Sequence, residues 1–284
     1  MPDFPLVDTH VHLYDPAAVR YPWMAGVPPL NSRHGPAEFT TAIGGIAVDK
    51  LVFVEVDAAP GENFAELAWV ADAATRDPRI QAMVASIALE KGRAIAAEIA
   101  AFAAMPLART VRRLIQDHVA EPGWCLRPDF LEGVRLVGEH RLGFEICILH
   151  PQMRDAIELV RRFPEIPFVL DHIGKPGIRD ALREPWWSDI RGLAALPNVV
   201  CKISGAVTEA DHAAWTYDQV APYVAHAIRC FGFDRVMFGG DWPVMELATR
   251  YPDWVDLVER ITAGASSADL RKLFRDNAIR RYRL

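Results

Sequence analysis

The feature that most constrains the fold of this chain is a regular alternation of short apolar runs with longer helical segments. The apolar runs are rich in Val, Ile, Leu and Phe, which is typical of strands buried on both faces of a parallel sheet. We expect eight such strands, at Phe4–Asp8, Lys50–Val56, Gln81–Ile87, Thr110–Ile115, Gly143–His150, Pro167–His172, Asn198–Ser204 and Arg235–Asp241. Helical patterns lie between them, at Asn63–Thr75, Ala94–Ala104, Arg127–Glu139, Met153–Phe163, Trp186–Ala195, Tyr217–Phe231 and Ala268–Arg281. Eight strand–helix units predict a closed (β/α)8 TIM barrel.

The length of 284 residues fits one such barrel, so we expect a single domain over residues 1–284. An open doubly wound sheet is the alternative, but no Gly-rich phosphate-binding fingerprint follows the first expected strand. The barrel should be distorted by a long loop after that strand, because Asp15–Glu38 carries five prolines together with Tyr21 and Trp23. Such a connection is often a lid or binding loop, and the alternative is that it only seals the barrel mouth.

Composition and charge exclude several classes of protein. The chain is 51% hydrophobic and 24% charged, with a formal net charge of −6, so it lacks the basic surface that nucleic-acid binding requires. No basic leader and no run of 18 apolar residues is present, and we expect neither a signal peptide nor a membrane span. The cysteines are scattered without CxxC spacing, at Cys125, Cys147, Cys201 and Cys230. We therefore expect reduced thiols in a cytoplasmic protein.

Polar side chains follow nearly every expected strand, at the end of the barrel where this fold places its active sites. His10 and His12 are spaced i, i+2, so on an extended chain both imidazoles point to the same side and form a candidate metal or proton-transfer site. The strand ends in order carry Asp8, His10, His12, Glu55, Asp57, Ser86, Arg112, Arg113, Gln116, His150, Asp171, His172, Lys202, Ser204, Asp241 and Trp242. Any one of them could be a loop cap, but buried carboxylates and imidazoles in such number need partners.

Three motifs give the chain a family resemblance: DTHVHL at the first expected strand, LDHIGKP at the sixth and MFGGDWPV at the eighth. Together they resemble the amidohydrolase superfamily, in the branch that includes sugar-lactone hydrolases and 2-pyrone-4,6-dicarboxylate hydrolase. YPWM at Tyr21–Met24 and VRRLIQ at Val111–Gln116 are more similar to the L-fucono-, L-rhamnono- and galactonolactonase members than to the pyrone enzymes. The resemblance spans essentially the whole chain.

The resemblance implies roles for individual residues. His10 and His12 match the metal-binding pair of the first strand, His172 matches the sixth-strand histidine, and Asp241 matches the aspartate that activates water. His150 lies near the fifth-strand histidine. Binuclear members bridge two metals with a carboxylated lysine on the fourth strand, where this chain has Arg112 and Arg113. The resemblance therefore implies one divalent ion, Zn²⁺ or Mn²⁺, and leaves metal-free activity open.

Lactone opening needs a base for water, a positive group near the carbonyl oxygen and a proton for the leaving oxygen. Asp241 can be the base, and a metal on His10, His12 and Asp241, with Glu55 as a further candidate ligand, can activate water and polarise the carbonyl. Glu55 could equally accept sugar hydroxyls or form an ion pair with Lys202. Without metal, Arg113, Lys202 and His172 would supply the electrophile, and Arg113 and Lys202 also suit an anionic aldonate product. Aromatic platforms for a sugar are expected at Trp23, Trp124 and Trp242.

We therefore expect a hydrolase that converts a small-molecule aldonolactone to its aldonic acid, with no nucleic-acid or membrane partner. The catalytic residues would be Asp241 and His172, and the substrate-binding residues Trp23, Arg113, Lys202, His150 and Trp242. The alternatives are a metal-dependent decarboxylase of the same superfamily and a lactonase of the 2-pyrone-4,6-dicarboxylate type. Homo-oligomer formation stays open.

Overall fold

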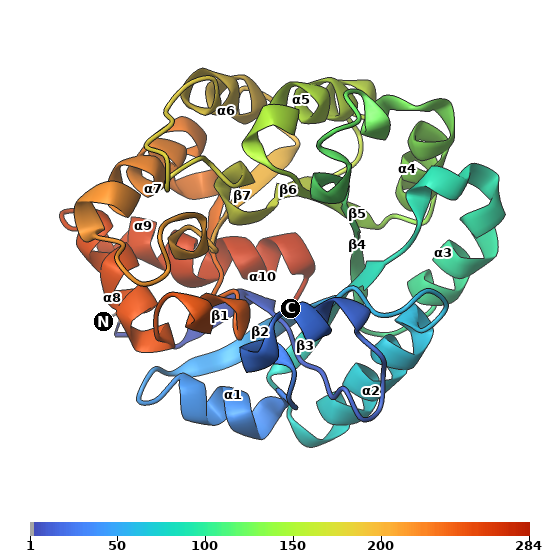
Figure 1. Ribbon diagram of the computed structural model, residues 1–284, viewed down its shortest axis with the longest axis horizontal. Helices are drawn as coiled ribbons and strands as arrows, with labels where there is room; N and C mark the ends of the chain where they lie inside the picture. The colour runs from blue at the N-terminus through green and yellow to red at the C-terminus, as the bar shows by residue number, and fades with distance from the viewer. Residues whose placement is uncertain (1–2) are drawn as a thin grey trace.

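A computed structural model describes residues 3–284 and contains one sheet of eight parallel strands in sequence order. Each strand pairs with the next, and the ends of β1 and β8 meet where Asp241 N–H donates to His10 O at 2.8 Å and His12 N–H to Trp242 O at 2.8 Å. The expected barrel is confirmed, and helices surround it (Figure 1). The strands are β1 Leu6–Val11, β2 Val48–Val54, β3 Ile80–Ser86, β4 Ala108–Leu114, β5 Gly143–Cys147, β6 Phe168–Leu170, β7 Val199–Ile203 and β8 Val236–Phe238.

The strands lie within a few residues of their expected positions, and the largest differences concern the site. β1 ends at Val11 instead of Asp8, so His10 belongs to the strand itself. β6 and β8 contain only three residues each, because the chain leaves the sheet before His172 and Asp241. Irregular backbone after these two strands is what turns both side chains toward the barrel axis.

The helical layer follows the apolar stripes in the sequence, with the expected Tyr217–Phe231 helix found at those bounds. The helix α8 was not expected, although Trp254, Val255 and Val258 form a buried stripe along it. The expected helix Ala268–Arg281 is divided by a π-helical segment, η11 at Lys272–Asp276. The helices are α1 Pro36–Ala42, α2 Asn63–Arg76, α3 Ala96–Ala103, α4 Pro128–Glu139, α5 Met153–Arg162, α6 Trp186–Ala194, α7 Tyr217–Phe231, α8 Tyr251–Ile261, α9 Ser267–Arg271 and α10 Asn277–Tyr282.

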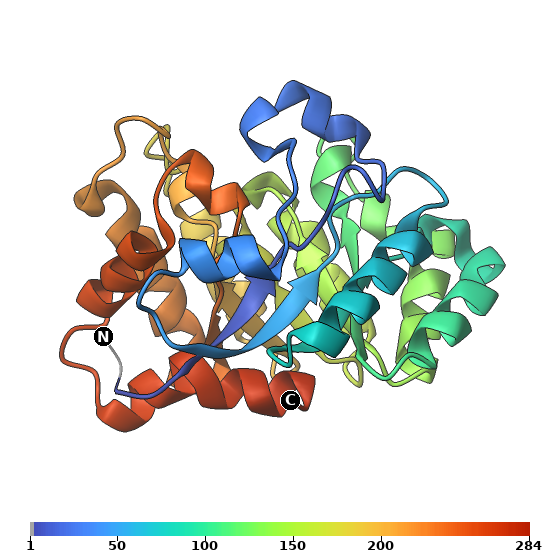
Figure 2. The same cartoon turned by 90° about the horizontal axis from the view of Figure 1, so that it is seen from below.

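Two segments from opposite ends of the chain cover the two ends of the barrel. The connection after β1 contains the 3-10 turns η1 Pro22–Gly26 and η2 Pro28–Leu30, and it lies at the end toward which the strands point (Figure 2). Its base is closed by two hydrogen bonds of 2.9 Å between the backbones of Tyr14 and His34. The helix α10 lies across the opposite end (Figure 2) and buries Tyr282 completely.

All four cysteines are free, and Cys125, Cys147 and Cys201 are buried. Within residues 3–284, none of the helices combines the length and the apolar character that crossing a bilayer requires.

Candidate active site

Asp241 lies directly after β8 at the barrel mouth and is held in a left-handed conformation with φ of +61°. A residue other than glycine seldom adopts this conformation unless its surroundings impose it. The two preceding glycines make the close approach to β1 feasible. A Cβ at Gly239 would lie 2.9 Å from His10 Cβ, and one at Gly240 would lie 2.5 Å from an Asp8 carboxylate oxygen. The Gly-Gly-Asp sequence therefore brings the Asp241 carboxylate against the histidine pair of the first strand.

Three imidazoles surround a single oxygen of Asp241. Asp241 Oδ1 lies 3.7 Å from His10 Nε2, 3.5 Å from His12 Nε2 and 3.9 Å from His172 Nε2. All four side chains are buried. Three strand ends that are distant in sequence thus bring together the four residues on which the sequence analysis placed most weight.

The hydrogen bonds of His12 decide which of its nitrogens is available. His12 Nδ1 lies 2.9 Å from Val54 O and 3.1 Å from Glu55 O. Carbonyl oxygens only accept hydrogen bonds, so Nδ1 carries the proton, and in the neutral ring Nε2 presents a lone pair. That lone pair faces Asp241 Oδ1, another acceptor. Two buried acceptors 3.5 Å apart need a proton or a metal cation between them.

The other two imidazoles are also suited to bind a cation. Burial, together with the charge of Lys202, holds the pKa of His10 well below its ordinary value, and burial does the same for His172. Burial would raise the pKa of Asp241, but His172, His12 and Lys175 bring it below its usual range. Ligand atoms of His10, His172 and Asp241 lie within 4.8 Å of one another. Neutral imidazoles and an ionised carboxylate at this spacing fit a divalent ion.

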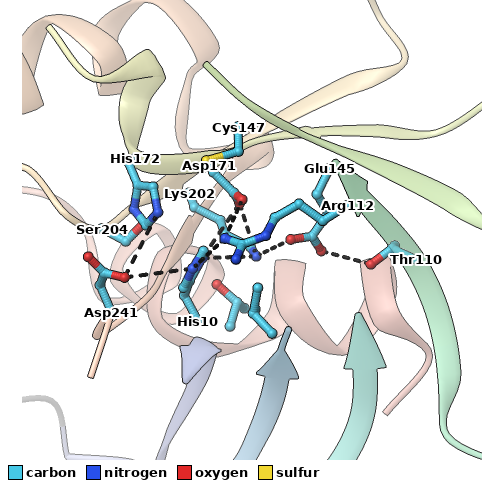
Figure 3. A network of polar contacts seen from close by, with 12 residues as sticks. His10, Thr110, Arg112, Glu145, Cys147, Asp171, His172, Lys202, Ser204 and Asp241 are labelled. Atoms are coloured by element: carbon cyan, nitrogen blue, oxygen red, sulfur yellow. Dashed lines mark hydrogen bonds and ion pairs between the residues drawn. The ribbon is translucent and has the colours of Figure 1, made fainter. Parts of the chain in front are cut away.

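Arg112 fills the space beside His10 at the centre of the barrel (Figure 3). Its Nε donates to Glu55 Oε1 at 2.5 Å and its Nη2 donates to Glu55 O at 2.8 Å. The second oxygen of Glu55 accepts the Asp57 N–H at 2.7 Å. The Glu55 carboxylate is therefore engaged by Arg112 and the backbone, and it is absent from the groups of described residues that could hold a metal. Glu55 thus pairs with Arg112, whereas the carboxylate that pairs with Lys202 is Glu145.

Lys202 lies deeper in the barrel than the sequence analysis expected. Its Nζ donates to Glu145 Oε2 at 2.5 Å and lies 3.1 Å from Asp171 Oδ1 and 3.2 Å from His10 Nδ1. The side chain is fully buried and does not line the pocket above His10. Lys202 therefore supports His10 from below and is not positioned to touch a substrate.

The pocket above the Asp241 carboxylate has a volume of about 360 Å³. Of the residues expected in the site, His12, Trp23, His172 and Asp241 line it. The additional polar lining residues are Tyr14, Asp57, Arg112, Gln116, Asp117, Lys175 and Thr208. This volume lies at the lower end of the range for small-molecule sites, which is about 300–1,000 Å³.

Lys175 is a cation of this pocket that the sequence analysis missed. It ends a run of four left-handed residues, with φ of +51°, +49°, +75° and +46° from His172 to Lys175. Its Nζ donates to Gln116 Oε1 at 2.5 Å. In the described part of the chain no carboxylate lies within ion-pair distance of it. Burial opposes its charge, but Cys147, Glu209 and Asp241 raise its pKa above the ordinary value. The only sequence signal was the Gly-Lys-Pro of the LDHIGKP motif, beyond the end of the expected strand.

Four residues expected at the site lie elsewhere. Arg113 forms a two-pronged ion pair with Glu90 at 3.0 and 2.7 Å, because successive side chains of β4 point to opposite faces and Arg112 takes the inner one. His150 begins a 3-10 turn beyond β5 and does not line the pocket. Trp242 is buried against Phe39, and its Nε1 donates to Glu246 at 2.9 Å. Trp124 is buried and stacks on His118.

Comparison with known proteins decides the family. A sequence model of the amidohydrolase family matches residues 7–284. The chain belongs to the amidohydrolase family. It is 31% identical to an L-fucono-1,5-lactonase of Burkholderia multivorans, over 98% of this chain and 96% of the relative.

Solved structures of other amidohydrolases have the same architecture. This amidohydrolase superposes on a crystal structure of a Burkholderia multivorans amidohydrolase with bound zinc, with a TM-score of 0.87, 30% identity and coverage of 99% of this chain and 100% of the other. A 5-carboxyvanillate decarboxylase from Novosphingobium aromaticivorans, complexed with manganese, superposes with a TM-score of 0.70 at 14% identity, over 100% of this chain and 97% of the other. The second likeness concerns the fold alone.

Proposed function

We propose that this amidohydrolase is a lactonase that hydrolyses an aldonolactone, such as L-fucono-, L-rhamnono- or galactonolactone, to the aldonic acid. The observation that carries the proposal is the buried Asp241 carboxylate, surrounded by three imidazoles, in a pocket that also contains Arg112 and Lys175. Base and cations are the groups that ester hydrolysis needs. The similarity to an L-fucono-1,5-lactonase over nearly the whole chain supports the choice of a lactone.

Asp241 is the general base in this mechanism. Its pKa is below the usual range, so the carboxylate is ionised at neutral pH and ready to take a proton from water. Water then adds to the lactone carbonyl carbon, the ring C–O bond breaks, and the proton returns to the leaving oxygen. His172 lies 3.9 Å from Asp241 and can carry that proton between the two oxygens. A divalent ion, Zn²⁺ or Mn²⁺, held by His10, His172 and Asp241 would lower the pKa of water and polarise the carbonyl.

The cations of the pocket stabilise negative charge on the carbonyl oxygen and on the product. Arg112 is fixed by two hydrogen bonds to Glu55, so its guanidinium is oriented before substrate enters. Lys175 lacks a carboxylate partner among the described residues and is free to bind the aldonate carboxylate. Trp23 offers an aromatic face for the C–H surface of a sugar ring. The four free cysteines are consistent with the cytoplasmic location that we propose.

A panel of aldonolactones with a pH indicator, run before and after chelation, tests this proposal. We expect acid release from at least one sugar lactone, and release about 10²–10⁴-fold slower from the Asp241→Asn variant. Loss of turnover after chelation, with recovery on adding Zn²⁺ or Mn²⁺, would indicate a metal requirement. Release of carbon dioxide without lactone opening would instead favour a decarboxylase, and turnover of only 2-pyrone-4,6-dicarboxylate would favour the pyrone branch.

A further inference from the structure

A second cavity of about 640 Å³ lies beside the catalytic pocket and is larger than it. Trp23, Asp57 and Asp117 line both spaces, so these three side chains mark the boundary between them. The proposed chemistry uses only the smaller pocket. The larger cavity therefore has no role in opening an unsubstituted lactone ring.

The boundary formed by Trp23, Asp57 and Asp117 combines an aromatic ring with carboxylates, as sugar-binding sites do. Trp23 is half-buried, and its Nε1 donates to Val56 O at 2.8 Å, which fixes the indole plane. Neither Asp57 nor Asp117 has a hydrogen-bond or ion-pair partner for its carboxylate within residues 3–284. A fixed aromatic face between two free carboxylates suits a ring with C–H faces and hydroxyl edges.

The backbone of Asp57, which forms part of this boundary, is strained. Asp57 has a φ of +54°, which is unfavourable for a residue other than glycine. Its N–H donates to Glu55 Oε2 at 2.7 Å, so the carboxylate that orients Arg112 also holds Asp57 in place. The catalytic pocket and the second cavity are thus joined by one hydrogen-bonded unit.

The rest of the second cavity favours a neutral polar occupant. Ser86 and Ala88 are small and leave room at its floor. Arg113 is neutralised by Glu90, and the other two charged lining residues, Lys91 and Glu98, carry opposite charges, so Asp57 and Asp117 leave the boundary negative. An anionic substituent would be repelled there, whereas hydroxyl groups can donate to the free carboxylates.

We propose that the second cavity is a subsite for a second sugar ring, so that the preferred substrate is a glycosylated aldonolactone. This inference rests on the proposed lactonase function. The lactone ring occupies the pocket at Asp241, and the second ring stacks on Trp23 and donates hydroxyl hydrogen bonds to Asp57 and Asp117. Only the ester C–O bond breaks, and the glycosidic bond stays intact.

The test compares the best aldonolactone of the panel with its galactosylated derivatives, one for each ring hydroxyl. We expect at least one derivative to have a KM about tenfold lower than the unsubstituted lactone at a similar kcat, because the second ring adds contacts in the second cavity. Ala88→Trp, which fills the second cavity, should remove this advantage and leave kcat and KM for the unsubstituted lactone unchanged. Ala94→Trp is the matched control, because Ala94 is exposed in η3 at Leu89–Ile95, the 3-10 turn that Ala88 precedes, and lines neither space.

The outcomes separate the two proposals. If the unsubstituted lactone is hydrolysed while every derivative is rejected or gains nothing, the subsite is overturned and the lactonase stands. An Ala88→Trp protein that loses activity equally on both substrates would also overturn the subsite. If no lactone of the panel is hydrolysed, the lactonase function itself fails.

Discussion

The buried charges of this barrel form two layers that differ in how completely they are paired. In the lower layer, Glu145 accepts hydrogen bonds from Thr110 at 2.8 Å, Tyr282 at 2.7 Å and Lys202 at 2.5 Å. In the upper layer, Asp241 Oδ1 faces three imidazole nitrogens at 3.5 to 3.9 Å. The Glu145 carboxylate is saturated by the protein itself, whereas Asp241 and His12 keep lone pairs at the wall of a pocket.

This difference indicates which buried charged groups remain able to bind a ligand or take part in a reaction. A saturated network holds the fold and positions its neighbours, because its groups have no capacity left for a ligand. An incompletely paired group keeps that capacity, at the cost of stability. His10 joins the layers, since its Nδ1 faces Lys202 below and its Nε2 faces Asp241 above.

The largest expected effect is on catalysis in the upper layer. Asp241→Asn keeps the size of the side chain but removes the basic oxygen, so kcat should fall by about 10²–10⁴-fold. KM and the thermal midpoint should change little, as measured by steady-state kinetics and thermal unfolding. A folded Asn variant with the kcat of the wild type would show that Asp241 only forms the turn after Gly239 and Gly240.

Substitutions in the lower layer should lower the free energy of unfolding. Lys202→Met leaves Glu145 and Asp171 buried without their ammonium partner, and we expect the free energy of unfolding to fall by about 3–5 kcal/mol. Urea denaturation measures the loss. Adding Glu145→Gln should restore part of it, because one uncompensated charge is then removed. A loss below about 1 kcal/mol, the value of an exposed pair, would contradict the distinction between the layers.

Lys175 tests whether the unpaired cation of the upper layer acts on the reaction. Lys175→Met should lower kcat/KM for the lactone by about 10²–10³-fold, the usual value of one group that stabilises an oxyanion. Lys272→Met is a suitable control, since Lys272 pairs with Asp234 near the other end of the barrel. Equal activities of the two variants would remove Lys175 from the mechanism.

Glu66 extends the comparison of buried charged groups, because it is incompletely paired but lies outside the pocket. Its Oε1 accepts the Val56 N–H at 3.0 Å, and the Tyr21 hydroxyl also interacts with the carboxylate. Burial and the charge of Glu55 raise its pKa well above the ordinary value of 4.5. The protonated form therefore favours the fold, and this contribution is lost as the pH rises from about 4.5 through the raised native pKa.

Glu66→Gln stays neutral at every pH, so its stability should match the wild type near pH 4 and exceed it by about 1–3 kcal/mol at high pH. Unfolding in urea at a series of pH values measures the divergence. Parallel stability curves for the two proteins would mean that Glu66 is not penalised by its environment.

The periodicity of the sequence was sufficient to predict the barrel, but some local features depended on distant contacts. The helix α8 was missed because Pro252 and Asp253 follow a polar turn, and its stripe becomes clear only against β8 and α7. The expected helix Ala268–Arg281 is interrupted at Lys272–Asp276, where its side chains pack under β1 and β8. Local propensity does not report such packing.

The sequence by itself determined the eight alternating units and the polar strand ends, with His10, His12, His172 and Asp241 among them, because strand and helix periods are local properties. Only the tertiary structure decided which polar residues share a space. Arg112 and Arg113 are adjacent in sequence, yet one enters the pocket and the other pairs with Glu90. Lys175 takes the place in the pocket that was expected for Lys202, since depth along the barrel axis decides whether a lysine meets buried carboxylates or the open pocket. Lys202 lies within β7, whereas Lys175 lies beyond the left-handed turn that follows β6, and only the folded barrel places these two positions at different depths.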